Sequence, residues 1–303
     1  MLLPFPSFKA LELHDRPQIE AITGDFPNYS DFNFVSLWSW DTRGEIAASV
    51  LHGNLVVKFT DYITGEPLYS FIGTNEVDDT IKQVTALARQ QGISDALELI
   101  PEEAITKIEN PEDFEIAEDP NNFDYIISVD SFTALQGQEY EAKRKAINQF
   151  KRAYPHVVSR PLDIKDEETQ TKIIGLAQLW VELKGHEALE AENELKAIER
   201  LLQYSYIFPP QGVGIYDGDK LIAFSIDEIM PDGINALGHF QKADSRYKGI
   251  FPFLQKENLS ELQKKGVQRL NIEQDLGLES LRRSKIQLRP IEYHKKYFVA
   301  VKH

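Results

Sequence analysis

Cysteine is absent from the 303 residues, and this absence excludes disulfide bonds, thiolate metal sites and cysteine nucleophiles. Long apolar runs are also absent, because no stretch approaches the ~18–20 residues that a helix needs to cross a bilayer. The N-terminal residues lack the basic segment of a secretory signal, and Pro4 and Pro6 interrupt them. These absences predict a protein without a transmembrane segment, and the cytoplasm is its expected location.

Metal-ligand spacing is lacking as well. The seven histidines include no His-x-x-x-His pair, so we predict no metal site. The first half of the chain also shows no convincing glycine-rich phosphate loop.

Positive charge is scarce in one part of the chain. Residues 1–130 hold 7 Lys and Arg against 24 Asp and Glu, a net charge of −17, whereas residues 131–303 hold 26 and 24. A chain of this length suggests two domains, which we place at 1–130 and 131–303. Because the acidic half repels nucleic acid, we expect no DNA partner and expect tRNA contact at the C-terminal half only.

Hydrophobic periodicity and turn residues predict an α+β fold. In the first half we expect helices over 11–22, 78–91 and 101–108 and strands over 46–50, 54–59, 68–72, 96–100, 114–118 and 125–129. In the second half we expect helices over 138–154, 165–184, 190–206, 250–265 and 278–285 and strands over 157–160, 212–216, 220–228, 235–241, 267–272 and 291–301. The aromatic stretch at 26–40 indicates core packing or, alternatively, an aromatic ligand cage.

A charged loop at 244–249 lies between a predicted strand and the helix over 250–265. The free N–H groups and the dipole of a helix start favour an anion. Arg246 and Lys248 would add donors for a phosphate. We expect the sheet to splay open beside this helix start and an anionic donor to bind in the gap. The alternative is an ordinary strand-to-helix turn with solvated charges.

Further cations lie on two other predicted helices. Lys143 and Arg144 stand on the helix over 138–154, whose basic face either binds anions or is simply solvated. Near the C-terminus, Arg282, Lys285 and Arg289 are candidates for binding the phosphates of a donor or of tRNA.

The acidic loop at 273–277 follows a predicted strand, where a carboxylate could meet a substrate. Glu273 is our candidate for a base or for an anchor of a substrate amine. Asp275 either takes part in catalysis or caps the helix that follows. Tyr293 is a candidate proton donor. His239 either packs in the core or acts as a base, which would require a carboxylate partner that the sequence does not place.

The strand, charged loop and helix resemble the last third of a GNAT-like N-acetyltransferase domain. In those domains an Arg/Gln-x-x-Gly-x-Gly/Ala loop cradles the pyrophosphate of coenzyme A. Here Arg246-Tyr-Lys-Gly249 keeps the first Arg and the Gly, and Phe251 stands where the second small residue is expected. The resemblance therefore implies that Arg246, Lys248 and Gly249 bind the donor.

A closer resemblance covers nearly the whole chain and is strongest after about residue 123. The pieces that carry it are Tyr140…Lys143-Arg144, Glu194…Ala197-Ile198, His239-Phe-Gln-Lys-Ala243, Lys248-Gly249 and Asn271-Ile-Glu-Gln-Asp-Leu-Gly277-x-x-x-Leu281-Arg-x-x-Lys285. They resemble the phosphatidylglycerol lysyltransferase C-terminal-domain family, which includes stand-alone proteins of unknown function. Two such units in tandem also resemble the Fem-type aminoacyl transferases. The resemblance implies two tandem GNAT-like domains, with mixed sheets flanked by helices, and adds Lys143 and Arg144 to the donor-binding residues.

The resemblance implies an acyltransferase or aminoacyltransferase. Its donor would be an acyl-CoA or an aminoacyl-tRNA, bound as a substrate and not as a tightly held cofactor, and its acceptor an amine or a hydroxyl. The alternative is a non-catalytic GNAT scaffold that binds a ligand or tRNA. Phe251, Gln241 and Ile272 favour this alternative, because each departs from the expected pattern.

Overall fold

The computed structural model describes residues 1–61, 64–184, 189–208 and 210–302. The chain forms two compact units. Unit 1 comprises Met1–Asp124, Gln274–Arg283 and Tyr293–His303, and unit 2 comprises Tyr125–Glu273 and Ser284–Glu292. Contrary to the division at residue 130 that the sequence suggests, two C-terminal segments therefore belong to unit 1.

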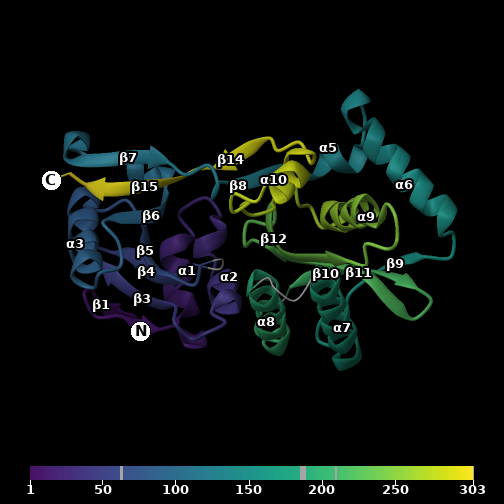
Figure 1. Ribbon diagram of the computed structural model, residues 1–303, viewed down its shortest axis with the longest axis horizontal. Helices are drawn as coiled ribbons and strands as arrows, with labels where there is room; N and C mark the ends of the chain where they lie inside the picture. The colour runs from purple at the N-terminus through teal and green to yellow at the C-terminus, as the bar shows by residue number, and fades with distance from the viewer. Residues whose placement is uncertain (62–63, 185–188, 209, 303) are drawn as a thin grey trace. The chain divides into compact units, whose positions relative to one another are not determined.

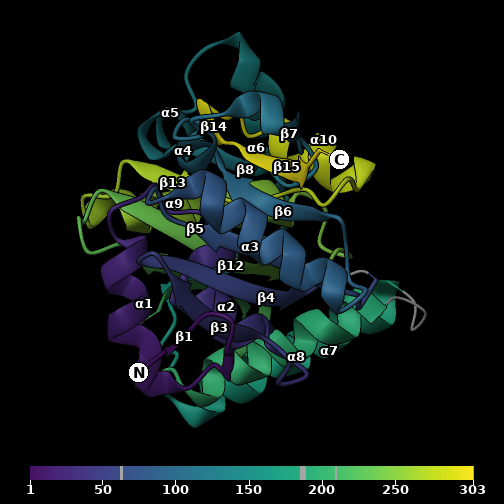
Figure 2. The ribbon, with the colours of Figure 1, turned by 90° about the vertical axis from the view of Figure 1, so that its left-hand side faces the viewer.

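Unit 1 carries two sheets in its described residues. Its strands are β1 (Leu3–Pro4), β2 (Lys9–Ala10), β3 (Ala47–Leu51), β4 (Asn54–Thr60), β5 (Pro67–Ile72), β6 (Ala96–Pro101), β7 (Phe114–Glu118) and β15 (Lys296–Val301). Its helices are α1 (Arg16–Thr23), α2 (Phe34–Trp40), α3 (Val77–Gln90) and α4 (Glu102–Ile105). One sheet has the order β1-β3-β4-β5, with β2 also on β3, and the other has the order β6-β15-β7. Helix α3 buries Val77, Ile81 and Val84 and packs against β5, β6 and β15 (Figure 2).

Unit 2 is built on one mixed sheet. Its strands are β8 (Asp124–Ser128), β9 (Val158–Pro161), β10 (Gln211–Asp217), β11 (Lys220–Ile229), β12 (Asn235–Ala243) and β13 (Arg269–Asn271), and its helices are α5 (Val129–Ala134), α6 (Glu141–Ala153), α7 (Glu167–Lys184), α8 (Leu189–Gln203) and α9 (Ile250–Lys264). The sheet order is β14-β8-β13-β12-β11-β10-β9, with β14 (Glu292–His294) at one edge. Helices α7 and α8 cover one face, and α9, with α5 and α6 beside it, covers the other (Figure 1). Helix α10 (Glu279–Ile286) begins in unit 1 and ends in unit 2.

Periodicity located most of these elements, and the α+β class is confirmed. Helix α2 was not predicted, because most of its residues are buried and they show no single apolar face. The strand predicted over 291–301 is interrupted at Lys295, so that it forms β14 and β15. The break predicted between the helices over 165–184 and 190–206 lies outside the described residues.

The sheet of unit 2 parts between β12 and β13. The two strands are parallel and pair over three rungs, of which the last joins Leu237 to Asn271. Strand β12 continues to Ala243 with β11 as its partner on the other side. Strand β13 ends at Asn271. The pairing of β12 with β13 therefore ends at the rung Leu237–Asn271, and the part of β12 beyond it, which leads into the loop before α9, has no β13 residue beside it.

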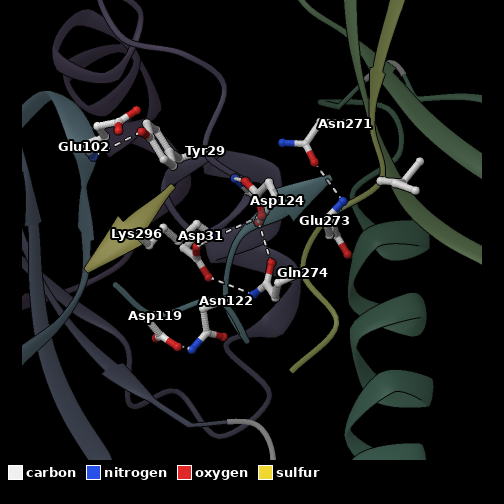
Figure 3. A network of polar contacts seen from close by, with 12 residues as sticks. Tyr29, Asp31, Glu102, Asp119, Asn122, Asp124, Asn271, Glu273, Gln274 and Lys296 are labelled. Carbon is white, nitrogen blue, oxygen red and sulfur yellow. Dashed lines mark hydrogen bonds and ion pairs between the residues drawn. The ribbon is translucent and has the colours of Figure 1, made fainter. Parts of the chain in front are cut away.

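A buried ammonium group joins three segments of unit 1. The Lys296 ammonium bonds the Asp31 carboxylate and lies 2.9 Å from Oδ1 of Asp124, and all three side chains are fully buried. The Ser30 N–H and hydroxyl donate to Asp124 at 2.7 and 2.6 Å. Gln274 donates from Nε2 to Oδ1 of Asp31 at 3.0 Å (Figure 3).

The two carboxyl groups around Lys296 differ in their acidity. Burial raises the pKa of Asp31, and the attraction of Lys296 opposes this only in part. Burial acts on Asp124 in the same direction, but Lys296 and the two bonds from Ser30 hold the pKa of Asp124 below its ordinary value. Lys296 and the bonds from Ser30 therefore outweigh the effect of burial at Asp124, whereas burial outweighs the effect of Lys296 at Asp31.

The Ser30 hydroxyl lies between two oxygen atoms. Its Oγ lies 2.6 Å from Oδ1 of Asp124 and 2.7 Å from Oε1 of Gln274, but a hydroxyl has one hydrogen. The hydroxyl therefore cannot donate to both oxygen atoms. Rotating the side-chain amide of Gln274, so that its nitrogen and oxygen exchange places, removes this conflict, because the two atoms are assigned from the hydrogen bonds around them. Its NH₂ group then donates to Ser30.

Replacement of Lys296 by Met should lower the free energy of unfolding by about 3–5 kcal/mol, because it leaves buried carboxyl groups without their cation. Asp31→Asn keeps the shape of the side chain and leaves Asp124 to pair with Lys296, so it should cost less than Lys296→Met, about 1–3 kcal/mol. Urea-induced unfolding at pH 7 measures both. Equal losses for Lys296→Met and Asp31→Asn would show that Asp31 is needed as an anion.

Candidate functional site

Buried polar side chains of unit 2 gather along β12 and its neighbour β11, near and past the last rung with β13. Lys242 and His239 lie on β12, and Asp227 lies on β11; all three are buried. Buried polar groups cost free energy unless they are bonded. Their concentration where the sheet parts therefore indicates a ligand site and not an ordinary core.

Lys242 reaches from β12 to both helices on the α7/α8 face. Its ammonium pairs with Glu194 of α8 and lies 3.9 Å from the centre of the Trp180 ring on α7. The side chains of Lys242 and Glu194 are 9% and 16% exposed. The aromatic face and the carboxylate both stabilise the charged form of the amine. A positive charge is thus held in place beside the opened strand.

His239 is the extra residue of a bulge in β12. Ile226 pairs with Phe240 and Asp227 pairs with Gly238, so the register of the two strands skips His239. Its Nε2 lies 3.4 Å from Oε2 of Glu228, and their side chains are 1% and 14% exposed. The carboxylate partner that the sequence did not place is therefore Glu228. Nε2 lies within ion-pair distance of this carboxylate but is not hydrogen-bonded to it, so His239 is a candidate base by its position beside Glu228.

Asp227 faces the other side of the sheet, beneath α9. Nδ2 of Asn258 donates to its Oδ1 at 3.2 Å. Burial raises the pKa of Asp227 to about 7, although the bond from Asn258 and the charge of Lys265 oppose the rise. Gln241, farther along β12, meets Gln255 of α9 at 3.4 Å. Polar groups therefore flank this part of β12 on both faces.

Glu273 lies on the other arm of the opening. It follows Asn271 by two residues, as His239 follows Leu237, so both candidate bases stand two residues past the last rung. Its backbone has a φ of +60°, which is strained for a residue with a side chain. Its N–H donates to Oδ1 of Asn271 at 2.7 Å (Figure 3). Tyr125 N–H donates to its carbonyl oxygen at 3.2 Å, which ties this strained turn to β8.

Arg246, predicted to hold a phosphate, bonds to the chain itself. It donates to Asp244 through its backbone N–H, Nε and Nη2, at 3.2, 2.7 and 2.6 Å. The guanidinium holds the pKa of the buried Asp244 at about 2. Beside this pair, Tyr247 donates to Asp217 at 2.8 Å. The side chain of Lys248 is exposed. Two carboxylates, Asp244 in the loop and Asp217 at the end of β10, reduce the attraction of this loop for a phosphate.

The start of α9 offers few N–H groups to an anion. The Ile250 N–H donates to the carbonyl of Tyr247, and Pro252 has no N–H, so at most the Phe251 N–H of the first three can face a ligand. Gly249 precedes the helix with a φ of +85°. A Cβ on it would come within 3.0 Å of the Ala146 carbonyl oxygen, because α6 packs here.

The two candidate cations on α6, Lys143 and Arg144, contact α5 and the residues that follow it. Arg144 donates to the carbonyl oxygens of Leu135 and Gly137, beyond the last residue of α5. The Lys143 ammonium lies 5.6 Å from the centre of the Phe132 ring, and burial lowers its pKa. A cation at a helix C-terminus satisfies free carbonyl groups and opposes the dipole. This structural role accounts for Arg144 without a ligand.

Three of the remaining candidates belong to unit 1. Arg282 binds both oxygens of the buried Asp275 at 2.9 Å and Asn121 at 2.6 Å. Asp275 also accepts the Gly277 N–H at 2.8 Å. Because α10 begins only at Glu279, Asp275 is not its N-cap, which was one of the two roles that the sequence left open. Tyr293 is exposed, with its ring 6.4 Å from that of Phe123.

Lys285 belongs to unit 2. Its ammonium donates to the carbonyl of Ile272 and lies 6.0 Å from the centre of the Tyr125 ring. It thereby fixes the end of β13, next to Glu273. Arg289, the last of the predicted phosphate ligands, is exposed and has a φ of +60°.

Residues 29–300 match the family described as phosphatidylglycerol lysyltransferase, C-terminal. The chain belongs to this family. No curated protein matches it in sequence. In this chain, the Asn271–Lys285 motif falls partly in unit 2 and partly in unit 1.

Solved structures show the same fold. A conserved protein of unknown function from Bacteroides thetaiotaomicron VPI-5482 is similar, with 24% identity, a TM-score of 0.83 and coverage of 97% of this chain and 99% of that chain. L-PGS from Bacillus licheniformis is 15% identical, with a TM-score of 0.62 over 95% and 92% of the two chains. FemX is 7% identical, with a TM-score of 0.56 over 98% and 97%. The fold is that of tandem GNAT-like proteins, as expected. Family and fold together indicate a GNAT-like acyl or aminoacyl transferase.

In this lysyltransferase-family chain, the sequence candidates do not form one cluster. Lys248 and Gly249 lie in the loop before α9. Lys143 and Arg144 lie on α6 and contact the end of α5. Glu273 follows the end of β13. Sequence reasoning missed Glu228 and Trp180, because neither stands in a recognisable motif. Glu194 and Lys242 did stand in the quoted motifs, and their pairing is the signal that was available.

Two groups of metal-ligand type are present among the described residues: Glu12, His14 and Asp15, and His52, Glu76 and Asp79. Lys9 forms ion pairs with Glu12 and Asp15 of the first group. The second group is largely exposed. The prediction of no metal stays a prediction. In the described part of the chain, no helix is both long and apolar enough to span a membrane.

The bond between Arg246 and Asp244 should make stability depend on acid pH. Because the pKa of Asp244 in the folded protein lies below its ordinary value, the stabilisation is complete above about pH 4 and is lost as the pH falls towards 2. Asp244→Asn should remove roughly 1–2 kcal/mol of unfolding free energy at pH 6, less than a fully buried pair because Arg246 is half exposed. Asp219→Asn, an exposed change two residues beyond Asp217, is the control. If urea unfolding at pH 6 and pH 3 shows the same difference between Asp244→Asn and the wild type, the bond does not carry this pH dependence.

Proposed function

We propose that unit 2 transfers an acyl or aminoacyl group to an amine or hydroxyl acceptor, in the opening between β12 and β13. The observation that carries this proposal is the end of β12–β13 pairing at Leu237–Asn271, with polar groups buried on both faces of β12 beyond it. The edge of β12 can form backbone hydrogen bonds to an extended ligand, as an added strand does. The polar side chains would orient its reacting groups.

We propose an aminoacyl-tRNA as the donor, in keeping with the family. A coenzyme A pyrophosphate would meet a single available N–H at the start of α9 and an arginine already bonded to Asp244. Helix α6 exposes Lys145, Lys151 and Arg152, which suit the backbone of an RNA. This donor also places the proposed reaction in the cytoplasm, where aminoacyl-tRNA is made.

The proposed reaction balances without a cofactor. The acceptor nitrogen or oxygen attacks the ester carbonyl of the donor, the ester C–O bond breaks, and the terminal hydroxyl of the tRNA leaves. The acceptor loses one proton to a base, and the leaving oxygen gains one. Glu273 is the proposed base, since it stands at the mouth of the opening on the β13 arm. His239, whose Nε2 lies 3.4 Å from Glu228, is the second candidate for the same task.

A non-catalytic, ligand-binding scaffold is the competing proposal. The observation in its favour is that the guanidinium groups of Arg144, Arg246 and Arg282 all donate hydrogen bonds to other residues of this chain. Such a protein would bind tRNA or another donor in the same opening without turnover.

Glu273→Gln should reduce kcat/KM for aminoacyl transfer by about 10²- to 10⁴-fold, the usual contribution of a general base. Transfer from radiolabelled aminoacyl-tRNA, and in parallel from acyl-CoA, to a mixture of amines and lipids measures it. Glu279→Gln, an exposed carboxylate on α10, should have no effect. His239→Gln shows whether the imidazole shares the task.

The outcomes separate the proposals. Transfer that survives both Glu273→Gln and His239→Gln would remove both residues from the mechanism. Tight binding of aminoacyl-tRNA without product would favour the scaffold. Product from acyl-CoA alone would overturn the choice of donor.

A further inference from the structure

Glu273 has a backbone conformation that residues with a side chain rarely adopt. Its φ of +60° lies in the left-handed region, where the Cβ atom is too close to the carbonyl oxygen. Such a conformation persists only where the bonds around it over-determine it, and it is found most often where a side chain has a task. The positive φ also turns the Cα–Cβ bond away from the direction that a further residue of β13 would give it. The turn, and not the strand, therefore aims the Glu273 carboxylate.

The four backbone polar groups of Ile272 and Glu273 are all bonded. The Ile272 N–H donates to the carbonyl oxygen of Tyr125 at 2.9 Å, and the Tyr125 N–H donates to that of Glu273 at 3.2 Å. The Lys285 ammonium donates to the Ile272 carbonyl oxygen. The Glu273 N–H donates to Oδ1 of Asn271, which is 3% exposed, at 2.7 Å (Figure 3). This last bond is made by a side chain, so a substitution at Asn271 removes it and leaves the backbone unchanged.

The residue after Glu273 is held as well, but within unit 1. Gln274 is 8% exposed, and its amide group lies 2.7 Å from Oγ of Ser30 and 3.0 Å from Oδ1 of Asp31. The division between the two units falls at the peptide bond between Glu273 and Gln274. The strained residue thus ends a segment bonded within unit 2, and the next residue begins a segment bonded within unit 1. Bonds on both sides therefore oppose a change of φ at Glu273.

We propose that Asn271 and Gln274 are positioning residues, which clamp Glu273 so that its carboxylate has one orientation before a substrate arrives. A base that is oriented in advance lowers the barrier of the transfer step, because less freedom is lost in reaching the transition state. The bonds of Gln274 thereby give unit 1 a part in the reaction that we assign to unit 2. This inference rests on the proposed function, because it takes Glu273 as the base.

Asn271→Ala should lower kcat of aminoacyl transfer by roughly 10²-fold, the loss expected when a reacting group is misplaced by about 1 Å. KM should stay within about threefold of the wild-type value, because the clamp acts on the base and not on substrate binding. Asn271→Asp keeps an acceptor oxygen for the Glu273 N–H and should restore most of kcat. Asn235→Ala is the matched control and should leave kcat unchanged. Asn235 also bonds a turn residue, Asp232, but it lies at the first rung of β12 with β13.

Gln274→Met tests the other side of the clamp. It removes the bonds to Ser30 and Asp31 at nearly constant volume, and it should lower kcat at least about tenfold with little change in KM. Gln170→Met on α7 is the control, because the Gln170 side chain also donates to two carbonyl oxygens, both within unit 2. Either Asn271→Ala or Gln274→Met decides the test if the other variant does not fold.

A double-mutant cycle shows whether the clamp acts through Glu273. In the Glu273→Gln background the base is already lost, so adding Asn271→Ala or Gln274→Met should reduce the remaining kcat by less than about threefold. A residue that merely supports the fold would reduce kcat equally in both backgrounds.

Hydrogen exchange at the Glu273 amide tests the clamp without any assay of transfer. Asn271→Ala should raise its rate roughly tenfold, the effect of losing one hydrogen bond, and Asn271→Asp should return it towards the wild-type rate. The Ile272 amide, which donates to the backbone of Tyr125, is the internal reference.

The results separate this inference from the proposed function. Equal losses of kcat in the wild-type and Glu273→Gln backgrounds overturn the positioning role, and so does a loss confined to a higher KM. Unchanged kcat in both Asn271→Ala and Gln274→Met overturns it even if Glu273→Gln abolishes transfer. If transfer occurs but does not depend on Glu273, the proposed base is wrong, and the exchange rate at its amide alone then decides whether the clamp exists. Faster exchange without any transfer supports the clamp and contradicts the catalytic proposal.

Discussion

The buried ammonium of Lys296 is the constraint on which the rest of the structure depends. It has to meet Asp31 and Asp124, which come from residues far earlier in the chain, and Gln274 joins the same cluster. These bonds commit three separate segments to unit 1. Because Gln274 follows Asn271 by three residues, the chain has to leave β13 almost as soon as that strand has formed. The short β13, the strained turn at Glu273 and the parted sheet in unit 2 are consistent with this one covalent restriction.

The buried polar residues around the opening of the sheet lower the free energy of unfolding relative to apolar packing at the same positions. Unit 2 buries the charged pair Lys242–Glu194 and the pair His239–Glu228 around β12, together with the under-bonded Asp227. Well-packed apolar residues would often serve stability as well or better at such positions. Elsewhere the cations of unit 2 do structural work: Arg144 binds the end of α5 and Lys285 binds the end of β13. The buried charges around β12 do not bind the end of a helix or a strand in this way, and this difference makes β12 the candidate position for a ligand.

Local sequence patterns predicted most helices and strands, because each depends on neighbours three to four residues away or two residues away. The partners of the polar side chains could not be predicted in this way. Ser30 meets Asp124 across 94 residues, and Lys296 meets Asp31 across 265. The Arg246 loop illustrates the limit: its spacing predicted a phosphate site, but Asp244, two residues earlier, takes the guanidinium. Composition could not show whether a cation was available, since that depends on which carboxylate lies nearest in space.

The central position of β15 between β6 and β7 has a consequence for the newly made chain. Domains usually fold in the order in which the ribosome releases them. Here the N-terminal unit lacks the middle strand of its second sheet, and the cation between Asp31 and Asp124, until residues 296–301 have been synthesised. The strands β9 to β13, by contrast, emerge in one run. The half of the protein that is made first is therefore the half that is finished last.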